Sequence, residues 1–229
     1  KGHTSIMQAV CSRSVDMLKF LKSQGCDMFA RDLTGCNAMI YAAWSGSVDI
    51  IMYLMQQGHS IYDRELDTNA SVFLVACGNG NLQAIQFMLF IDSSFLFNVN
   101  DNGATCFHAS AFGGCCQVFE FLYKFAKSKG ALDLFHRLDQ DGMTVFSCAA
   151  RGGHVDMMKW MVQTGFVTDK HIRKDPGIIC VAAMNNTREG LIYLQDLGFD
   201  VLSNHEGDTA LSAACRCGNL DGVTWLIGQ

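Results

Sequence analysis

The stretch GMTVFSCAARGGHVDMMKWMVQTG, residues 142–165, holds two short helical segments on either side of a Gly-Gly-His turn. The first segment carries Ala149 and Ala150, whose small side chains let a neighbouring helix approach closely. The second segment is amphipathic and places apolar residues at helical spacing on one face: Val155, Met158, Met161 and Val162. A second glycine then ends the segment. The stretch therefore predicts a helix-turn-helix unit with an apolar face that it cannot bury alone.

The same pattern recurs along the chain at a nearly constant period. Related stretches begin at intervals of 33, 34, 34, 39, 33 and 32 residues, at Gly2, Gly35, Asn69, Gly103, Gly142, Asp175 and Gly207. Because each unit needs neighbours to cover its apolar face, the units are expected to stack into a row. We predict one continuous array over residues 1–229, with units at 1–31, 32–64, 65–99, 100–138, 139–171, 172–203 and, in part, 204–229.

Glycine with threonine two places later, a pair of small residues, Gly-His-Val-Asp and a closing Gly-x-Asp together resemble the ankyrin repeat family. The resemblance covers essentially the whole chain, and it is strongest in the fifth and seventh units. It implies an all-α solenoid of stacked helix-turn-helix units with short, hairpin-like fingers. Two family features are weak here, since no unit has the usual proline after the threonine and the usual histidine survives only as His108. The array is therefore divergent.

The composition limits the classes of function. A net charge of −5 is unlike that of nucleic-acid-binding domains, and we predict no nucleic-acid partner. Eleven cysteines set within apolar runs indicate reduced thiols and a cytoplasmic location, with a cytoskeletal or nuclear one left open. Residues 68–91 are uncharged and long enough to span a bilayer, but Gly78-Asn79-Gly80-Asn81 at their centre favours a helix-turn-helix instead. We expect no membrane insertion.

Candidate chemical sites are weak. Cys106, His108, Cys115 and Cys116 have the residue types that bind zinc, but a helix separates Cys106 from Cys115 by about 13 Å, too far for one tetrahedral site. Cys215 and Cys217 are too close in sequence for a zinc clamp. No nucleophile elbow, phosphate-binding loop or zinc-protease helix is present in the sequence. We predict no catalytic residue, no cofactor and no metal.

The resemblance to ankyrin repeats implies binding through the fingers and the exposed ends of the first helices, which together line a concave groove. Transferred to this sequence, these positions are the two that follow each small-residue pair. They give the predicted partner-binding residues Trp44, Ser45, Asn79, Phe112, Arg151, Met184, Asn185 and Arg216. Aromatic residues and arginine often anchor interfaces. The alternative is that Trp44 or Phe112 only covers a neighbouring unit.

Two segments depart from the regular repeat. The fourth interval is longer than the others, and residues 124–137 are expected to extend a second helix and then a finger, as a functional insertion or a tolerated surface loop. Residues 170–174 contain Lys170, Arg173 and Lys174, which predict either a solvated basic loop or a contact with an acidic partner or a phosphorylated group.

The sequence favours a non-catalytic interaction or scaffold module that binds a protein partner, or neighbouring subunits of a larger assembly, in its groove. The alternative is a cytoplasmic regulatory segment of a larger membrane protein or enzyme, of the palmitoyltransferase or cation-channel type, whose activity lies outside these residues. The chain starts at Lys1 rather than at methionine and ends on apolar residues, so we expect it to be a segment of a longer protein. The partner's identity does not follow from the sequence.

Overall fold

The computed structural model describes residues 2–168, 175, 177–185, 188–205 and 207–229. Within them the helices follow one another in pairs, a first and a second helix in each unit. The pairs are α1 (Ser5–Cys11) and α2 (Val15–Ser23), α3 (Ala38–Ser45) and α4 (Val48–Gln56), α5 (Val72–Gly78) and α6 (Leu82–Ile91), α7 (Cys106–Phe112) and α8 (Cys116–Ser128), α10 (Val145–Gly152) and α11 (Val155–Gln163), α13 (Ile178–Ala183) and α14 (Glu189–Asp196), and α15 (Ala210–Cys217) and α16 (Leu220–Ile227).

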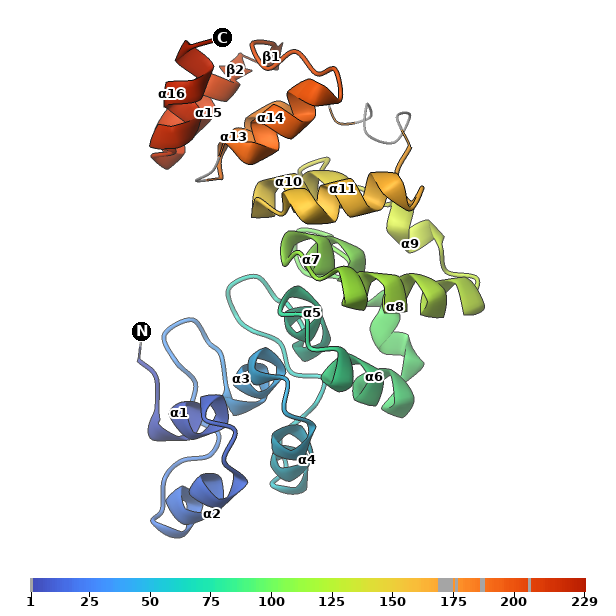
Figure 1. Ribbon diagram of the computed structural model, residues 1–229. Coiled ribbons are helices and arrows are strands. Elements are labelled where there is room, and N and C mark those ends of the chain that lie inside the picture. Colours follow the sequence, from blue (N-terminus) through green and yellow to red (C-terminus); the bar gives the residue numbers. More distant parts are fainter. Residues whose placement is uncertain (1, 169–174, 176, 186–187, 206) are drawn as a thin grey trace.

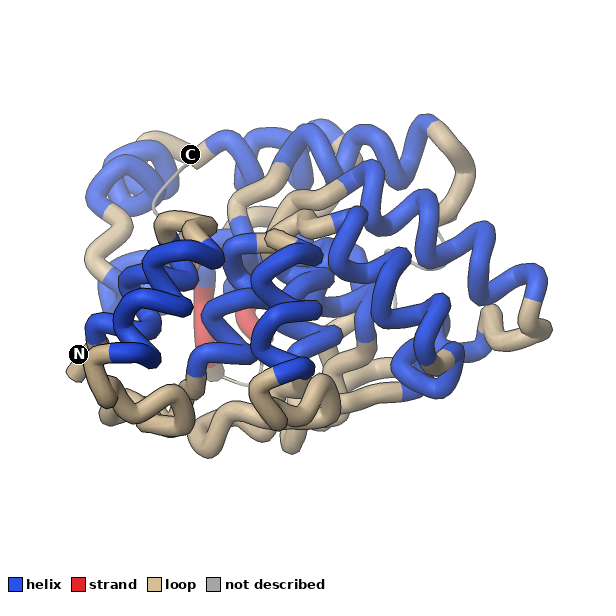
Figure 2. The backbone as a smooth tube through the Cα atoms, turned by 90° about the horizontal axis from the view of Figure 1, so that it is seen from below, coloured by secondary structure: helices blue, strands red, loops and turns tan. Residues whose placement is uncertain are grey.

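The pairs stack in sequence order into a curved row (Figure 1). From α3 to α11 the first helix of each pair lies toward the inside of the curve and the second helix toward the outside. Many of the loops lie side by side along one edge of the row (Figure 2). The expected solenoid of stacked helix pairs is therefore confirmed.

Side-chain caps begin most of the first helices. Thr144 Oγ1 accepts a hydrogen bond from Ser147 N at 3.1 Å, and Asn37 Oδ1 accepts one from Ile40 N at 3.1 Å. Such caps satisfy N–H groups that have no partner inside the helix. They supply the helix-start signal that the missing prolines would otherwise give.

The short connections that precede the first helices, which we call the fingers, contain little regular structure. In the last described finger, β1 (Asn204–His205) pairs antiparallel with β2 (Asp208–Thr209). A single bridge joins Arg64 to Ser71 in an earlier finger. The hairpin-like fingers expected from the sequence are thus present in minimal form.

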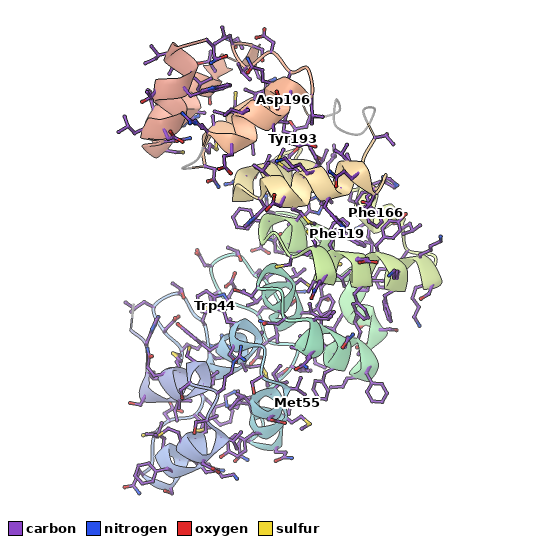
Figure 3. The ribbon with its side chains drawn as sticks, in the orientation of Figure 1. Trp44, Met55, Phe119, Phe166, Tyr193 and Asp196 are labelled. Atoms are coloured by element: carbon purple, nitrogen blue, oxygen red, sulfur yellow. The ribbon has the colours of Figure 1, made fainter. Side chains whose placement is uncertain are left out.

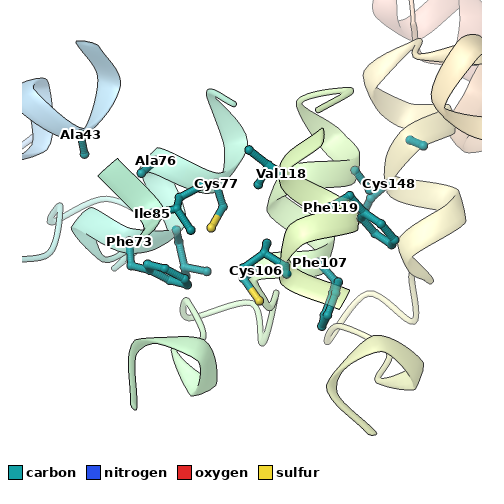
Figure 4. Packing of buried hydrophobic residues seen from close by; sticks show 14 of the residues in the cluster. Ala43, Phe73, Ala76, Cys77, Ile85, Cys106, Phe107, Val118, Phe119 and Cys148 are labelled. Carbon is teal, nitrogen blue, oxygen red and sulfur yellow. The ribbon is translucent and has the colours of Figure 1, made fainter. Parts of the chain in front are cut away.

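The core runs along the row between the helix layers. One apolar residue, four positions after the first residue of each repeated stretch, is almost completely buried in the first six units: Ile6, Met39, Phe73, Phe107, Phe146 and Ile179. Figure 4 shows Phe73 and Phe107 in this core together with Cys77 and Cys106. Since each unit packs mainly on the units before and after it, the core is continuous although no single unit is large enough to have one.

The uncharged stretch 68–91 forms α5, a turn and α6, as expected. None of the helices in the described residues is both long enough and apolar enough to cross a bilayer.

The longer fourth interval adds helix rather than a finger. Helix α8 is 13 residues long, and a further short helix, α9 (Asp133–His136), follows it. The extension of the second helix is as predicted, but the second half of the insertion differs from the expected finger. The reason is burial, since Leu134 and Phe135 are buried and the Phe135 ring lies 5.8 Å from that of Phe107. The basic segment 170–174 lies outside the described residues.

Candidate functional site

Two adjoining hollows form a groove along the inner side of the described array. The main hollow, of about 710 Å³, lies between the fingers of the third, fourth and fifth units and the exposed ends of α5, α7 and α10. The second hollow, of about 310 Å³, extends from it toward α3. Both are lined by Glu65, Val75, Gly78 and Phe112, so they form one continuous groove.

Trp44 and Phe112 line this groove from equivalent positions at the ends of α3 and α7. Each keeps 52% of its surface exposed although it is large and apolar. Figure 3 shows Trp44 at the inner edge of the row, and its ring packs edge-on against Tyr41 at 5.5 Å. Gly78 occupies the equivalent position in the unit between them, and because it has no side chain the space between the two aromatic residues stays open.

Arg151 also lines the main hollow, at the end of α10, and is exposed. Asn79 is exposed and lines the second hollow. The structure therefore brings four of the predicted residues, Trp44, Asn79, Phe112 and Arg151, to one groove.

The remaining predicted residues have other surroundings. Ser45 is half-buried, and its carbonyl oxygen accepts a hydrogen bond from Arg13 of the preceding unit. Asn185 Nδ2 donates to the carbonyl oxygen of Arg151 at 3.0 Å, which ties two successive units together. Met184 is half-buried, and Arg216 forms an ion pair with Asp208. None of these four lines either hollow.

Close contact between units explains why the second position of each predicted pair is often not a groove position. At Gly113 and Gly152 a side chain would overlap the backbone of the preceding unit, at Gly78 and Phe112 respectively. Asn81, the residue that precedes α6, is a further contact with the preceding unit and donates from Nδ2 to the carbonyl oxygens of Ala43 and Trp44, at 2.6 and 2.9 Å. These positions set the spacing between the units.

Four carboxylates line the main hollow, and the sequence analysis did not select them. They are Glu65, Asp101, Asp139 and Asp141, all on fingers. Asp139 Oδ1 accepts hydrogen bonds from Asp141 N at 3.0 Å and from Met143 N at 2.8 Å, so the carboxylate also shapes its own finger. An acidic residue shortly before the glycine of a finger is the signal that could have identified Asp139 and Asp141.

Two arginines of the earlier fingers form hydrogen bonds to the backbone of the fingers. Arg64 Nη1 donates to the carbonyl oxygens of Asn69 and Val99, at 2.7 and 2.9 Å. Arg31 Nη1 donates to the carbonyl oxygen of Gly35 at 2.6 Å. Because these guanidinium groups bind the chain's own backbone, the fingers are held in place before any partner binds.

His108 lines the main hollow, but it is almost completely buried and links two units. The Thr105 N–H donates to His108 Nδ1 at 3.2 Å, and His108 Nε2 then donates to the carbonyl oxygen of Met143 in the next unit at 3.3 Å. Burial lowers the pKa of His108 below its usual value, which favours this neutral form.

The cysteines near His108 face different partners. Cys106 Sγ points to the Leu96 carbonyl oxygen, Cys115 Sγ to that of Gly113, and Cys116 Sγ to Met157 Sδ. Burial raises the pKa of Cys106 to about 12, so this thiol stays protonated near neutral pH. In the part of the chain that the structure describes, no three His, Cys, Asp or Glu side chains are grouped so that they could hold a metal ion.

All eleven cysteines are free, and most are at least partly buried. Cys77 and Cys148 are buried, whereas Cys11 and Cys215 are exposed. Cys215 lies in α15, and Cys11 is the last residue of α1.

Comparison with known proteins agrees with this geometry. The sequence model described as ankyrin repeats (3 copies) matches residues 1–65, which form the first two helix pairs and the start of the third finger. Residues 1–65 contain ankyrin repeats. The helix pairs beyond residue 65 stack in the same manner, consistent with an ankyrin-repeat solenoid. No curated protein matches the chain. Ankyrin repeats are usually non-catalytic and generally mediate protein binding.

Proposed function

We propose that this chain is a non-catalytic protein-recognition module whose groove, from Trp44 to Arg151, holds a segment of a partner protein. The observation that carries the proposal is the pair of half-exposed aromatic rings, Trp44 and Phe112, on either side of the space over Gly78. Large apolar side chains left open to water in a concave site are typical anchors for a partner.

The mechanism is binding by a surface that is already organised. The fingers are tied by Arg31 and Arg64, and neighbouring first helices are tied by Asn81 and Asn185. Because these contacts exist without a partner, little ordering entropy is lost on association. The eleven free cysteines support a cytoplasmic location, where thiols remain reduced.

The test compares three forms of the chain as bait: the native form, Trp44→Ala/Phe112→Ala and the control Phe20→Ala/Phe90→Ala. The control removes exposed aromatic residues from the second helices α2 and α6, away from the groove. Quantitative mass spectrometry of captured proteins is the measurement, and circular dichroism checks that each variant is folded. We expect proteins that the native form and the control retain and that the groove variant loses. Equal capture by a folded groove variant would show that the groove is not the binding surface.

A further inference from the structure

The charges of the groove point to the chemistry of the partner. We infer that the main hollow selects a peptide segment that carries a lysine or arginine beside an apolar residue, with the cationic group placed among the finger carboxylates. This inference rests on the proposed function and specifies which partners the groove accepts.

The charge of the main hollow is predominantly negative. Glu65, Asp101, Asp139 and Asp141 line the main hollow, and Arg151 is the one cationic residue among the residues that line it. Acidic groups around a concave, partly apolar site raise the local concentration of cations and repel anions. A phosphorylated segment, a nucleic acid or an anionic membrane would therefore be disfavoured in this hollow.

In the described part of the chain, none of these four carboxylates forms an ion pair. The ion pairs found there join other residues: Lys19–Asp16, Lys124–Glu120, Arg137–Asp133, Arg188–Asp221 and Arg216–Asp208. The groove carboxylates instead accept from neutral groups. Asn69 Nδ2 donates to Asp101 at 2.7 Å, and Asn102 Nδ2 donates to Asp141 at 3.0 Å and to Asp139 at 3.3 Å.

The shared donor Asn102 keeps Asp139 and Asp141 close together with only a neutral amide between them. Two like charges held near each other repel, and an added cation relieves that repulsion while it gains its own attraction to both. A partner's ammonium or guanidinium group thus displaces no ion pair formed by the described residues. A carboxylate already in an ion pair would not offer this gain.

The same hollow also has an apolar wall. Leu74, Ala104, Phe112 and Met143 line it together with the carboxylates. Lysine and arginine side chains combine a long apolar stem with a charged end, so they can contact both parts of the lining at once. The half-exposed Phe112 ring also offers a face on which a cation can stack.

The arrangement fits a side chain better than a metal ion. No three acidic, histidine or cysteine side chains of the described residues converge closely enough to coordinate a metal. The carboxylates come from three successive fingers and are distributed along a hollow of about 710 Å³. A row of separated charges beside an apolar wall matches an extended segment with spaced cationic and apolar residues.

The experiment selects peptides from a random 12-residue phage library on the purified chain. Selected peptides are then synthesised, and their affinity is measured by fluorescence anisotropy. The test variant is Asp101→Asn/Asp141→Asn, which keeps an oxygen acceptor at two exposed positions and removes two charges. The control variant, Asp49→Asn/Asp196→Asn, makes the same change in charge on the exposed second helices α4 and α14, outside the groove.

We expect selected sequences rich in lysine or arginine, and an affinity about tenfold lower for the test variant but unchanged for the control. Affinity for the native chain should also fall as the salt concentration rises. Selected peptides without a positive charge bias, or equal binding by the two variants, would overturn the inference and leave the proposed recognition function standing. Failure to select any peptide would instead count against both. Arginine methyl ester is a further probe, and if it binds as tightly as the peptides, the site takes a small cation and the inference is wrong.

Discussion

Gly113 controls how closely the third and fourth units approach. It follows the end of α7 with φ −84° and ψ −3°, a conformation that alanine adopts without strain. A Cβ placed there would lie 2.8 Å from the Gly78 carbonyl carbon and would overlap the carbonyl oxygen, whereas ordinary contact begins at 3.4 Å. Gly113→Ala therefore tests packing between units alone, because the backbone conformation itself is acceptable.

The expected cost follows from that overlap. The obstacle is backbone rather than the end of a flexible side chain, so α5 and α7 must move apart. A separation of about 0.5–1 Å loses between a quarter and a half of the attraction at each affected contact. Overpacked sites cost roughly 1–3 kcal/mol, and the helix preference of alanine over glycine offsets at most about 1 kcal/mol. We expect Gly113→Ala to lower the free energy of unfolding by about 2 kcal/mol.

The matched control is Gly190→Ala in α14. Among the described residues, a Cβ at residue 190 would meet only Ala182 Cβ, at 3.9 Å, which is an ordinary contact. The same substitution should therefore stabilise the chain there, by up to about 1 kcal/mol. Urea unfolding followed by circular dichroism measures both free energies. The reasoning is refuted if Gly113→Ala is as stable as the native chain, or if Gly190→Ala loses as much stability as Gly113→Ala.

Two further predictions concern pH and the insertion. Burial lowers the pKa of both His59 and His108, so the unfolded chain binds more protons than the folded chain below the ordinary value of 6.5. The urea concentration at the midpoint of unfolding should therefore be lower at about pH 5.5 than at about pH 7.5. A higher midpoint at the lower pH would contradict this prediction. Phe135→Ala should cost about 3 kcal/mol because its ring packs among those of the aromatic core, whereas the exposed Lys127→Ala should change stability by less than about 0.5 kcal/mol. Equal thermal midpoints for these last two variants would mean that α9 is dispensable.

The groove could be predicted only in part. The sequence shows which residues occupy equivalent positions in the repeat, but it does not show which residues of the adjacent units they contact. Trp44 and Phe112 follow from a repeat alignment, since an exposed position at the end of a first helix is exposed in most units. Asn185 occupies the same kind of position as Asn79, yet it binds the Arg151 carbonyl of the preceding unit. Whether such a side chain faces the groove or the adjacent backbone depends on distances between units, and these are not encoded in any one unit.

By itself the sequence determined the helix-turn-helix unit, its period and the stacking of the units. These are local properties, set by caps, glycines and the spacing of apolar residues, and each unit repeats them. Only the tertiary structure decided that Glu65, Asp101, Asp139 and Asp141 share one hollow and that residues 133–136 form a helix against Phe107. The physical reason is that charges and rings from different units meet only when the units pack, and the closeness of that packing is set by contacts such as Gly113 on Gly78.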